Sequence, residues 1–303
     1  MSISASTDAA VAAANTESRR RWQVSQRRRR YLLVAPPMLV MIAFIVLGIF
    51  ADVIAPGDPG DTNLLSRLEP PVFSGGTSEF PLGTDHVGRD IWTRVVHGAR
   101  VSLIVVAIVV PGAALFGTVI GMFAGWRGGI VGQLLMRYVD VQLALPPILF
   151  AVLLGAVLGA SLRNVILILL VWTWTVYARL IRAEVLSLKE REFVLASLAA
   201  GGSNWWIMRK QLLPNVFNTI VVIMTLEIPI VIVAEASLSF LGVGAPVEQA
   251  TWGRMITEAR NYLTHAWWVM WMPGLALMLV ALSGNLVGDW LRDLLDPRLR
   301  NLG

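Results

Sequence analysis

Long apolar runs alternate with short polar segments along most of the chain. Six of these runs contain 18 or more residues, and they cover residues 31–54, 101–124, 133–158, 164–181, 216–243 and 265–288. A helix rises about 1.5 Å per residue, so runs of this length can cross a hydrocarbon core of about 30 Å. The pattern therefore predicts an all-α polytopic membrane protein with six transmembrane helices.

The polar segments divide the chain into regions. Residues 1–30 form an Ala- and Ser-rich, then basic tail without hydrophobic periodicity, which we expect to be largely disordered. Residues 31–54 are the first predicted span, and residues 55–100 form a segment rich in Gly, Pro and Asp that is too polar to span. Residues 182–214 are charged and helix-prone but do not span, and residues 290–303 form a charged tail.

Composition supports the membrane assignment and narrows the chemistry. Apolar residues make up 56% of the chain and charged residues 15%, against about 45–50% and about 25% in soluble domains. The chain has no cysteine and three scattered histidines, so it offers no thiolate metal site, cysteine nucleophile or zinc motif. Neither of its lysines follows a phosphate-binding glycine loop, so we expect any energy source to lie on another chain.

Basic residues are distributed unevenly between the two sides of the predicted bundle. The net charge is +5, and seven arginines between residues 19 and 30 directly precede the first span. We interpret this run as a cytoplasmic flank and expect no nucleic-acid partner. With Arg137 set aside because it lies within a span, 17 Arg and Lys residues fall on the side of the N-terminus and seven on the other. The positive-inside rule then places both termini in the cytoplasm.

Residues 182–214 hold the most informative pattern. A short helix from about residue 192 to 200 is apolar on nearly every face, and Gly201-Gly202 can end it because glycine tolerates a positive φ. Ser203 can cap a second short helix that runs to Pro214. An apolar helix outside the bilayer has to bury against something. The residues alone fit two interpretations, an amphipathic segment in the lipid interface and a docking element for another protein.

This pattern resembles the "EAA" loop of ABC-importer membrane subunits, which binds a cytoplasmic ATPase. Ala196 matches the first alanine, Gly201 the glycine, and Leu213-Pro214-Asn215 the ending. Leu195 stands where the family usually has glutamate and Ser197 where it has a second alanine, whereas the helix–glycine–helix pattern is unchanged. The resemblance implies an ATPase-coupling loop formed by Glu192, Phe193, Val194, Leu195, Ala196, Ser197, Gly201, Ser203, Leu213, Pro214 and Asn215.

Shorter motifs along residues 31–300 resemble the C-type permease subunit of the dipeptide/oligopeptide/nickel family. They are Gly83-Thr84-Asp85, Gly88-Arg89-Asp90, Gly98 to Leu103, Met136-Arg137 with Asp140, Glu235 to Gly242, Trp252-Gly253, and Asn285 to Asp293. The resemblance implies a type I ABC-importer permease fold in the bacterial inner membrane, with a permease core at residues 98–289.

The resemblance also implies the rest of a machine. It consists of a homologous B-type permease, two cytoplasmic ATP-binding subunits and an extracytoplasmic substrate-binding protein. ATP and Mg²⁺ would be bound by the ATPases, and this chain would bind no cofactor and catalyse no reaction. The expected substrate is a short peptide, with nickel or another small solute as the alternative. A membrane enzyme or a structural or sensory membrane protein is the competing class, but the chain shows no catalytic cluster and has a docking loop that such proteins do not need.

Charged and small residues within the predicted spans complete the candidates. A carboxylate in a span should face a partner or a pathway rather than lipid. We expect Glu235 to be hydrogen-bonded to a neighbouring helix, and we leave Glu227 open between cavity lining and packing. Arg137 and Asp140 are three residues apart on one helical face, which predicts a local ion pair. Three glycines spaced four apart predict close helix packing, namely Gly117, Gly121 and Gly125.

Overall fold

The computed structural model of the chain describes residues 34–246 and 249–295. Within these residues it contains helices, turns and a single isolated bridge between Thr84 and Asp90, and no β-strand. The basic tail at residues 1–30 and the last eight residues lie outside this part. The elements, after an N-terminal helix at Val34–Ile49, are α2 (Ala51–Ile54), α3 (Ile91–Arg127), α4 (Gly129–Ala144), α5 (Pro147–Leu158), α6 (Leu162–Lys189), α7 (Glu192–Ala199), α8 (Asn204–Ile207), α9 (Leu213–Phe240), α10 (Trp252–Ala259) and α11 (Trp268–Leu295).

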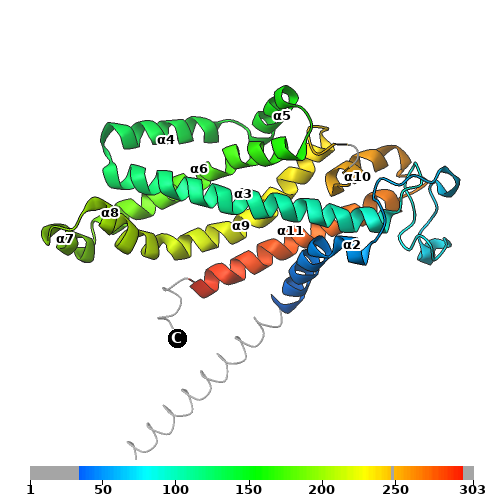
Figure 1. Cartoon of the computed structure of the whole chain (residues 1–303), viewed down its shortest axis with the longest axis horizontal. Coiled ribbons are helices and arrows are strands. Elements are labelled where there is room, and N and C mark those ends of the chain that lie inside the picture. The colour runs from blue at the N-terminus through cyan, green and yellow to red at the C-terminus, as the bar shows by residue number, and fades with distance from the viewer. Residues whose placement is uncertain (1–33, 247–248, 296–303) are drawn as a thin grey trace, which may run out of the picture.

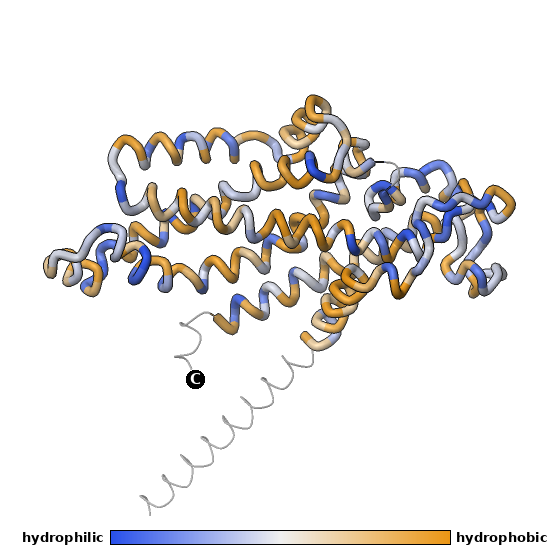
Figure 2. Tube along the Cα trace, in the orientation of Figure 1, coloured by the Kyte–Doolittle hydropathy of each residue, from blue (hydrophilic) through white to orange (hydrophobic). Residues whose placement is uncertain are grey.

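The long helices lie side by side and give the molecule two distinct ends (Figure 1). One end carries α7 and α8, and we call it the α7 end. The other carries residues 55–90 and α10, and we call it the α10 end. Apolar residues are concentrated along the long helices, whereas polar residues gather at the α10 end (Figure 2). The distribution is that of a helical membrane protein.

Four helices are long and apolar enough to cross a membrane: α3, α6, the continuous helix Asn204–Phe240, and α11. The predicted third span, residues 133–158, is not one straight helix. It is divided into α4 and α5, which meet at an angle of 91°. Leu145 has an extended backbone, with φ −78° and ψ 140°, because a residue before proline is disfavoured in the helical conformation. The pair counts as a fifth span only if both halves are taken together.

The expectation of a separate helix ending at Pro214 is wrong. Residues Asn204 to Phe240 form one helix, which passes through a π turn at Met208–Leu212. The Leu213 N–H donates to the carbonyl of Met208, five residues back. Pro214 has no N–H to give to the carbonyl four residues before it, and its ring would clash there in a regular α-helix. The wider turn lets the helix continue past the proline.

The predicted glycine packing is confirmed at the contact between α3 and α6. A Cβ atom on Gly117 would lie 2.3 Å from the carbonyl oxygen of Trp174, and one on Gly121 would lie 2.6 Å from that of Ala178. These distances are too short for any side chain. The two helices therefore approach as closely as their backbones allow, which stabilises the pair through dispersion contacts.

Candidate functional site

The α7 end presents a short apolar helix with most of its surface uncovered. Val194 is the buried side chain of α7, and it packs in a cluster with Ile207 and Leu212. Phe193 and Leu195 lie on the exposed surface, and Leu195 keeps 52% of its side-chain area accessible. Val194 thus anchors α7 against the bundle, while most of the other apolar side chains of α7 are exposed.

The predicted glycine turn after α7 is confirmed. Gly201 has a φ of +80°, in the left-handed region. The N–H of Gly202 donates to the carbonyl of Ser197 at 2.9 Å, and the N–H of Gly201 donates to that of Leu198 at 3.0 Å. This pair of bonds is a Schellman motif, which closes the helix and reverses the chain. No neighbour lies within 4 Å of a Cβ built on Gly201, so the backbone conformation alone favours glycine there.

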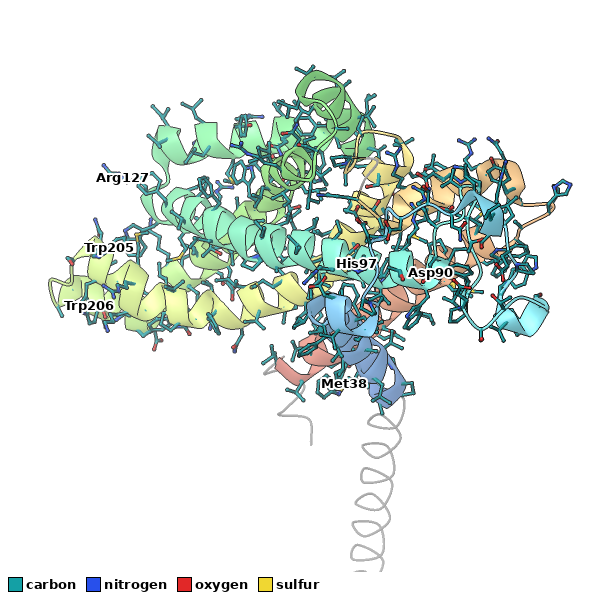
Figure 3. The ribbon with its side chains drawn as sticks, turned by 45° about the vertical axis from the view of Figure 1, so that its right-hand side comes forward. Met38, Asp90, His97, Arg127, Trp205 and Trp206 are labelled. Carbon is teal, nitrogen blue, oxygen red and sulfur yellow. The ribbon has the colours of Figure 1, made fainter. Side chains whose placement is uncertain are left out.

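The turn leads directly into α8, whose start is also as predicted. The Ser203 hydroxyl accepts a hydrogen bond from the N–H of Trp206 at 3.3 Å and so caps the helix. Trp205 is 70% exposed, and Figure 3 shows Trp205 and Trp206 at the same extremity of the molecule as Arg127. We call the exposed large apolar side chains of α7 and α8 the coupling surface: Phe193, Leu195, Leu198, Trp205 and Trp206.

Ser197 fastens this surface to the rest of the chain. Its hydroxyl donates to the carbonyl of Phe193 at 3.0 Å and accepts a hydrogen bond from the Gln211 side chain in the π turn. Asn215 donates to the carbonyl of Gln211 at 2.6 Å. No pattern in the sequence indicates the role of Gln211, because this hydrogen bond joins residues 14 positions apart whose approach depends on the turn at Gly201.

At the α10 end, three buried charged side chains and the partly buried Glu258 form an ion cluster, and Arg254 also binds Glu258 at 3.1 Å. Asp85 binds Arg89 at 2.6 Å and also binds Arg94, and Glu258 of α10 binds the same two arginines at 2.6 and 3.0 Å. Burial raises the pKa of the Asp85 carboxyl, but the charge of Arg94 and the hydrogen bonds and charge at Arg89 outweigh this effect, so the pKa lies below its ordinary value. The cluster ties the segment before α3 to a helix more than 160 residues later.

Asp85, His86 and Glu258 also place ligand-type atoms within 4.8 Å of one another. Both carboxylates already face guanidinium groups, and the positive charge of Arg89 and Arg94 opposes a metal cation. The geometry is that of an ion cluster that holds two segments together.

Further contacts fix the segment at residues 55–100 on the bundle. The Trp268 indole donates to the carbonyl of Thr84 at 3.2 Å, and the Trp252 indole donates to that of Val95 at 2.9 Å. Gly88 has a φ of +80°, and a Cβ there would lie 1.7 Å from the carbonyl oxygen of Asn63. These contacts hold the segment against the bundle, so it is not a loose linker.

Comparison with known proteins identifies the family to which this chain belongs. Residues 117–301 match the family described as binding-protein-dependent transport system inner membrane component. The chain belongs to this family. It is a multi-pass membrane permease subunit of an ABC importer, as the resemblance implied.

Several relatives of this permease are similar over most of their length. The dipeptide transport system permease protein DppC of Alkalihalophilus pseudofirmus is 39% identical over 87% of this chain and 85% of its own. The oligopeptide transport system permease protein OppC of Bacillus subtilis is 36% identical, with the same coverage. Among solved structures, a chain of the MetNI methionine ABC transporter in an inward-facing conformation matches with a TM-score of 0.50 and 21% identity, over 68% of this chain and 97% of that one. This likeness shows the fold.

The structure places the charged residues that the sequence analysis singled out within the spans, and the outcomes differ. Glu235 is 1% exposed and accepts hydrogen bonds from Ser102 of α3 at 3.1 Å and from Ser239 at 2.8 Å, which confirms its predicted structural role. Glu227 is 7% exposed, which leaves both of its interpretations open. The predicted pair of Arg137 with Asp140 is wrong.

Asp140 is paired across helices rather than along its own. Its carboxylate binds Arg179 of α6 at 2.6 Å, whereas Arg137 is exposed. The reason is geometric: α4 packs beside α6, so the guanidinium of Arg179 reaches the carboxylate from the neighbouring helix. The spacing of residues along one helix shows which ion pairs can form within that helix. It does not show whether a residue of a neighbouring helix can bind the same carboxylate instead.

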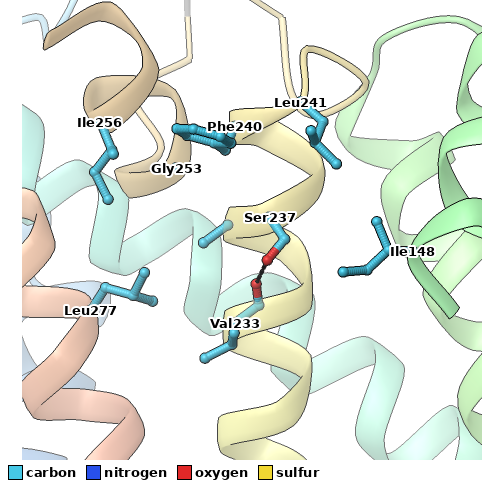
Figure 4. Close-up of a pocket in the computed structure, with 9 residues that line it drawn as sticks. Ile148, Val233, Ser237, Phe240, Leu241, Gly253, Ile256 and Leu277 are labelled. Carbon is cyan, nitrogen blue, oxygen red and sulfur yellow. Dashed lines mark hydrogen bonds between the residues drawn. The ribbon is translucent and has the colours of Figure 1, made fainter. Parts of the chain in front are cut away.

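An apolar cavity of about 410 Å³ opens between four helices near the α10 end. Its one hydroxyl, on Ser237, donates to the carbonyl of Val233 at 2.7 Å and is therefore already satisfied (Figure 4). The cavity thus presents apolar surface and no unsatisfied polar group of its own. Its lining includes Ile148 of α5, Val233, Ser237 and Phe240 of α9, Ile256 of α10 and Leu277 of α11.

Proposed function

We propose that this permease forms a transmembrane pathway for short peptides together with a homologous B-type permease, and that cytoplasmic ATPases drive it through the coupling surface. The peptide assignment is supported by the relatives, whose names specify dipeptide and oligopeptide transport. Nickel or another small solute is the alternative substrate, and uptake by the assembled complex distinguishes them. The chain has no catalytic role of its own in this proposal, and ATP and Mg²⁺ are bound by the ATPases.

The observation that carries the proposal is the form of the coupling surface. Its aromatic and aliphatic side chains are exposed, yet α7 is fixed by the buried Val194, the Gly201 turn and the bond from Gln211 to Ser197. A rigid, exposed apolar helix suits insertion into a preformed groove, because docking then costs little conformational entropy. Glu192, in the first turn of α7, also favours the helix through its charge near the helix N-terminus.

The orientation follows from the same interpretation. If α7 faces the cytoplasmic ATPases, then the α10 end faces outward, where a substrate-binding protein would deliver its cargo. The 17-to-7 division of basic residues supports this direction. In the proposed topology the N-terminal helix is the first of six spans, α4 and α5 together are the third, both termini are cytoplasmic, and residues 98–289 form the permease core.

The docking proposal is tested by purifying the permease in detergent together with the partner ATPases. We expect the wild-type permease to retain an ATPase and the Ala196→Asp variant to lose it, since a charge in an apolar contact costs a few kcal/mol. A matched control is Asn63→Asp, which places a charge on an exposed residue at the α10 end. Equal ATPase recovery with Ala196→Asp and with the wild type would contradict the docking proposal, and would favour burial of α7 in the lipid interface.

A further inference from the structure

Lys189, the last residue of α6, makes two contacts with Trp126 in the last turn of α3. Its ammonium group donates to the Trp126 carbonyl at 3.0 Å and lies 5.6 Å from the centroid of the indole ring. The last carbonyls of a helix lack N–H partners within it, and a cation near them is favourable. The indole face adds a cation–π attraction. Lys189 therefore joins the ends of two helices at the base of the coupling surface.

The same place is continuous with α7. Only two residues separate Lys189 from Glu192, and the Arg191 N–H donates to the Leu188 carbonyl at 3.0 Å, which makes the connection tight. Trp126 belongs to the apolar cluster that contains Val194 of α7. A displacement of α7 therefore acts on the end of α3 through both the Lys189 contact and this cluster.

At its other end, α3 enters the charged cluster. Arg94, in the first turn of the helix, is almost wholly buried and binds Glu258 of α10 at 3.0 Å. Arg94 and Trp126 are 32 positions apart on one continuous helix that contains Pro111, and this separation corresponds to about 48 Å at 1.5 Å per residue. Helix α3 thus spans the distance between the coupling surface and α10.

A second connection runs through α9, and it is of a different kind. Helix α9 reaches α10 through a hydrogen bond from the Thr257 hydroxyl to the Phe240 carbonyl at 2.8 Å. Its other end meets the coupling surface through the π turn at Met208–Leu212, whose wider hydrogen-bonded rings interrupt the regular α-helical ladder. The tight glycine packing of α3 on α6, by contrast, leaves α3 little room to move independently of α6, the helix that leads into α7.

We propose that Lys189 is a positioning residue for transport, which ties the coupling surface to α3 and, through α3, to the Glu258 cluster at the α10 end. The proposal rests on the function proposed above, since it requires that an ATPase binds at one end and a substrate-binding protein at the other. In this proposal, α3 transmits the effect of binding from one end of the permease to the other. Binding of the substrate-binding protein at the α10 end then alters ATP hydrolysis by the ATPase at the coupling surface.

The test measures ATP hydrolysis by the complete complex, with and without its substrate-binding protein. We expect Lys189→Met to leave ATPase association unchanged and to reduce the stimulation by the binding protein about 3- to 10-fold, as expected for the loss of a contact of this type. Lys189→Arg should recover most of the stimulation, because it keeps the positive charge beside the carbonyl and the ring. Normal stimulation with Lys189→Met would overturn the proposal and would favour the route through α9.

A double-mutant cycle separates this role from a local structural one. Glu258→Gln should also reduce the stimulation, and the Lys189→Met/Glu258→Gln double variant should be no worse than the more impaired single variant. Distant, independent sites instead give multiplied effects, and that result would overturn the proposal. Thr77→Ala is the control, since the Thr77 hydroxyl donates its hydrogen bond to Glu69, another residue of the segment at residues 55–90.

Two further measurements keep the outcome interpretable. If Glu258→Gln lowers the amount of permease in the membrane, Glu258→Asp is used in its place. Aspartate keeps the negative charge, but its shorter side chain increases the distance from the carboxylate to Arg94. Uptake and ATPase recovery with the wild-type complex are measured beside the cycle. Failure of both in the wild type would count against the proposed function, whereas a normal wild type with multiplied effects in the cycle would count against the α3 route alone.

Discussion

The carboxylate of Glu235 on α9 accepts a hydrogen bond from the hydroxyl of Ser102 on α3, with an O···O distance of 3.1 Å. Both side chains are buried, and Ser239, one turn further along α9, supplies a second hydroxyl at 2.8 Å. A carboxyl group inside a membrane helix is costly unless it is paired. This contact therefore explains how α9 keeps a glutamate in the centre of the bundle and binds α3 with it.

The first prediction concerns this contact. Ser102→Ala should lower the free energy of unfolding by about 1–3 kcal/mol, because it leaves one carboxyl oxygen without a partner. Thermal unfolding of the permease in detergent measures the effect. The control is Ser237→Ala, since the Ser237 hydroxyl bonds only to a carbonyl of its own helix. A larger loss with Ser237→Ala than with Ser102→Ala would contradict the assignment.

The second prediction concerns the glycine packing of α3 on α6. Gly121→Ala should destabilise the permease strongly, because the new methyl group would lie 2.6 Å from a backbone oxygen that cannot rotate away. Gly274→Ala, in α11, should be neutral or stabilising by up to about 1 kcal/mol, because nothing lies within 4 Å of its Cβ position and alanine is the better helix former. In detergent, the melting temperature should therefore fall for Gly121→Ala and stay the same or rise for Gly274→Ala. Equal changes in the two variants would contradict the close approach of α3 and α6.

The third prediction concerns the turn after α7. Gly201→Val should cost about 1–2 kcal/mol in the left-handed conformation and should misdirect α8. We expect normal membrane levels but reduced ATPase association and uptake. Gly201→Asn is the matched control, since asparagine tolerates this conformation better than other side chains. The turn would have no role in coupling if the valine variant transported as well as the asparagine variant.

The fourth prediction concerns topology, and the cysteine-free chain makes it simple to test. A cysteine at the exposed Thr62 should react with a membrane-impermeant maleimide in intact spheroplasts. A cysteine at the exposed Ala200 should react only after lysis. The reverse pattern would show that the proposed orientation is inverted.

The fifth prediction concerns acid. The pKa of Asp85 is lower in the folded permease than the ordinary value of about 3.9. Its stabilising effect is therefore complete at pH values above the ordinary pKa and is lost as the pH falls through the lower, folded pKa. Resistance of residues 55–90 to limited proteolysis should be constant from about pH 5 to pH 8 and should decrease below about pH 4. Asp85→Asn should reduce this resistance at neutral pH and flatten the acid response; an unchanged acid response would assign it to other groups.

The sequence by itself determined the helical class, the positions of most long helices and the glycine turn at residue 201. These features depend on local properties: the length of apolar runs, the conformational freedom of glycine and the small size of the glycines on α3. The resemblance of residues 192–215 to a coupling loop was equally local, since it depends on spacing along the chain. The family comparison confirms the family to which that resemblance pointed.

Only the tertiary structure decided which partners the polar groups have. Asp140 binds Arg179 rather than Arg137, Gln211 reaches Ser197, and Lys189 meets Trp126, although nothing in the sequence marks these pairs. Each partner lies on another element, so its identity depends on how helices pack and on the direction of the chain after a turn. The bend between α4 and α5 belongs to the same class: Pro146 and Pro147 permit a break there, but only the folded chain shows its angle of 91°. Hydrophobic burial responds to composition over many residues, whereas a hydrogen bond requires two particular atoms to lie within about 3 Å, and only the folded chain brings them there.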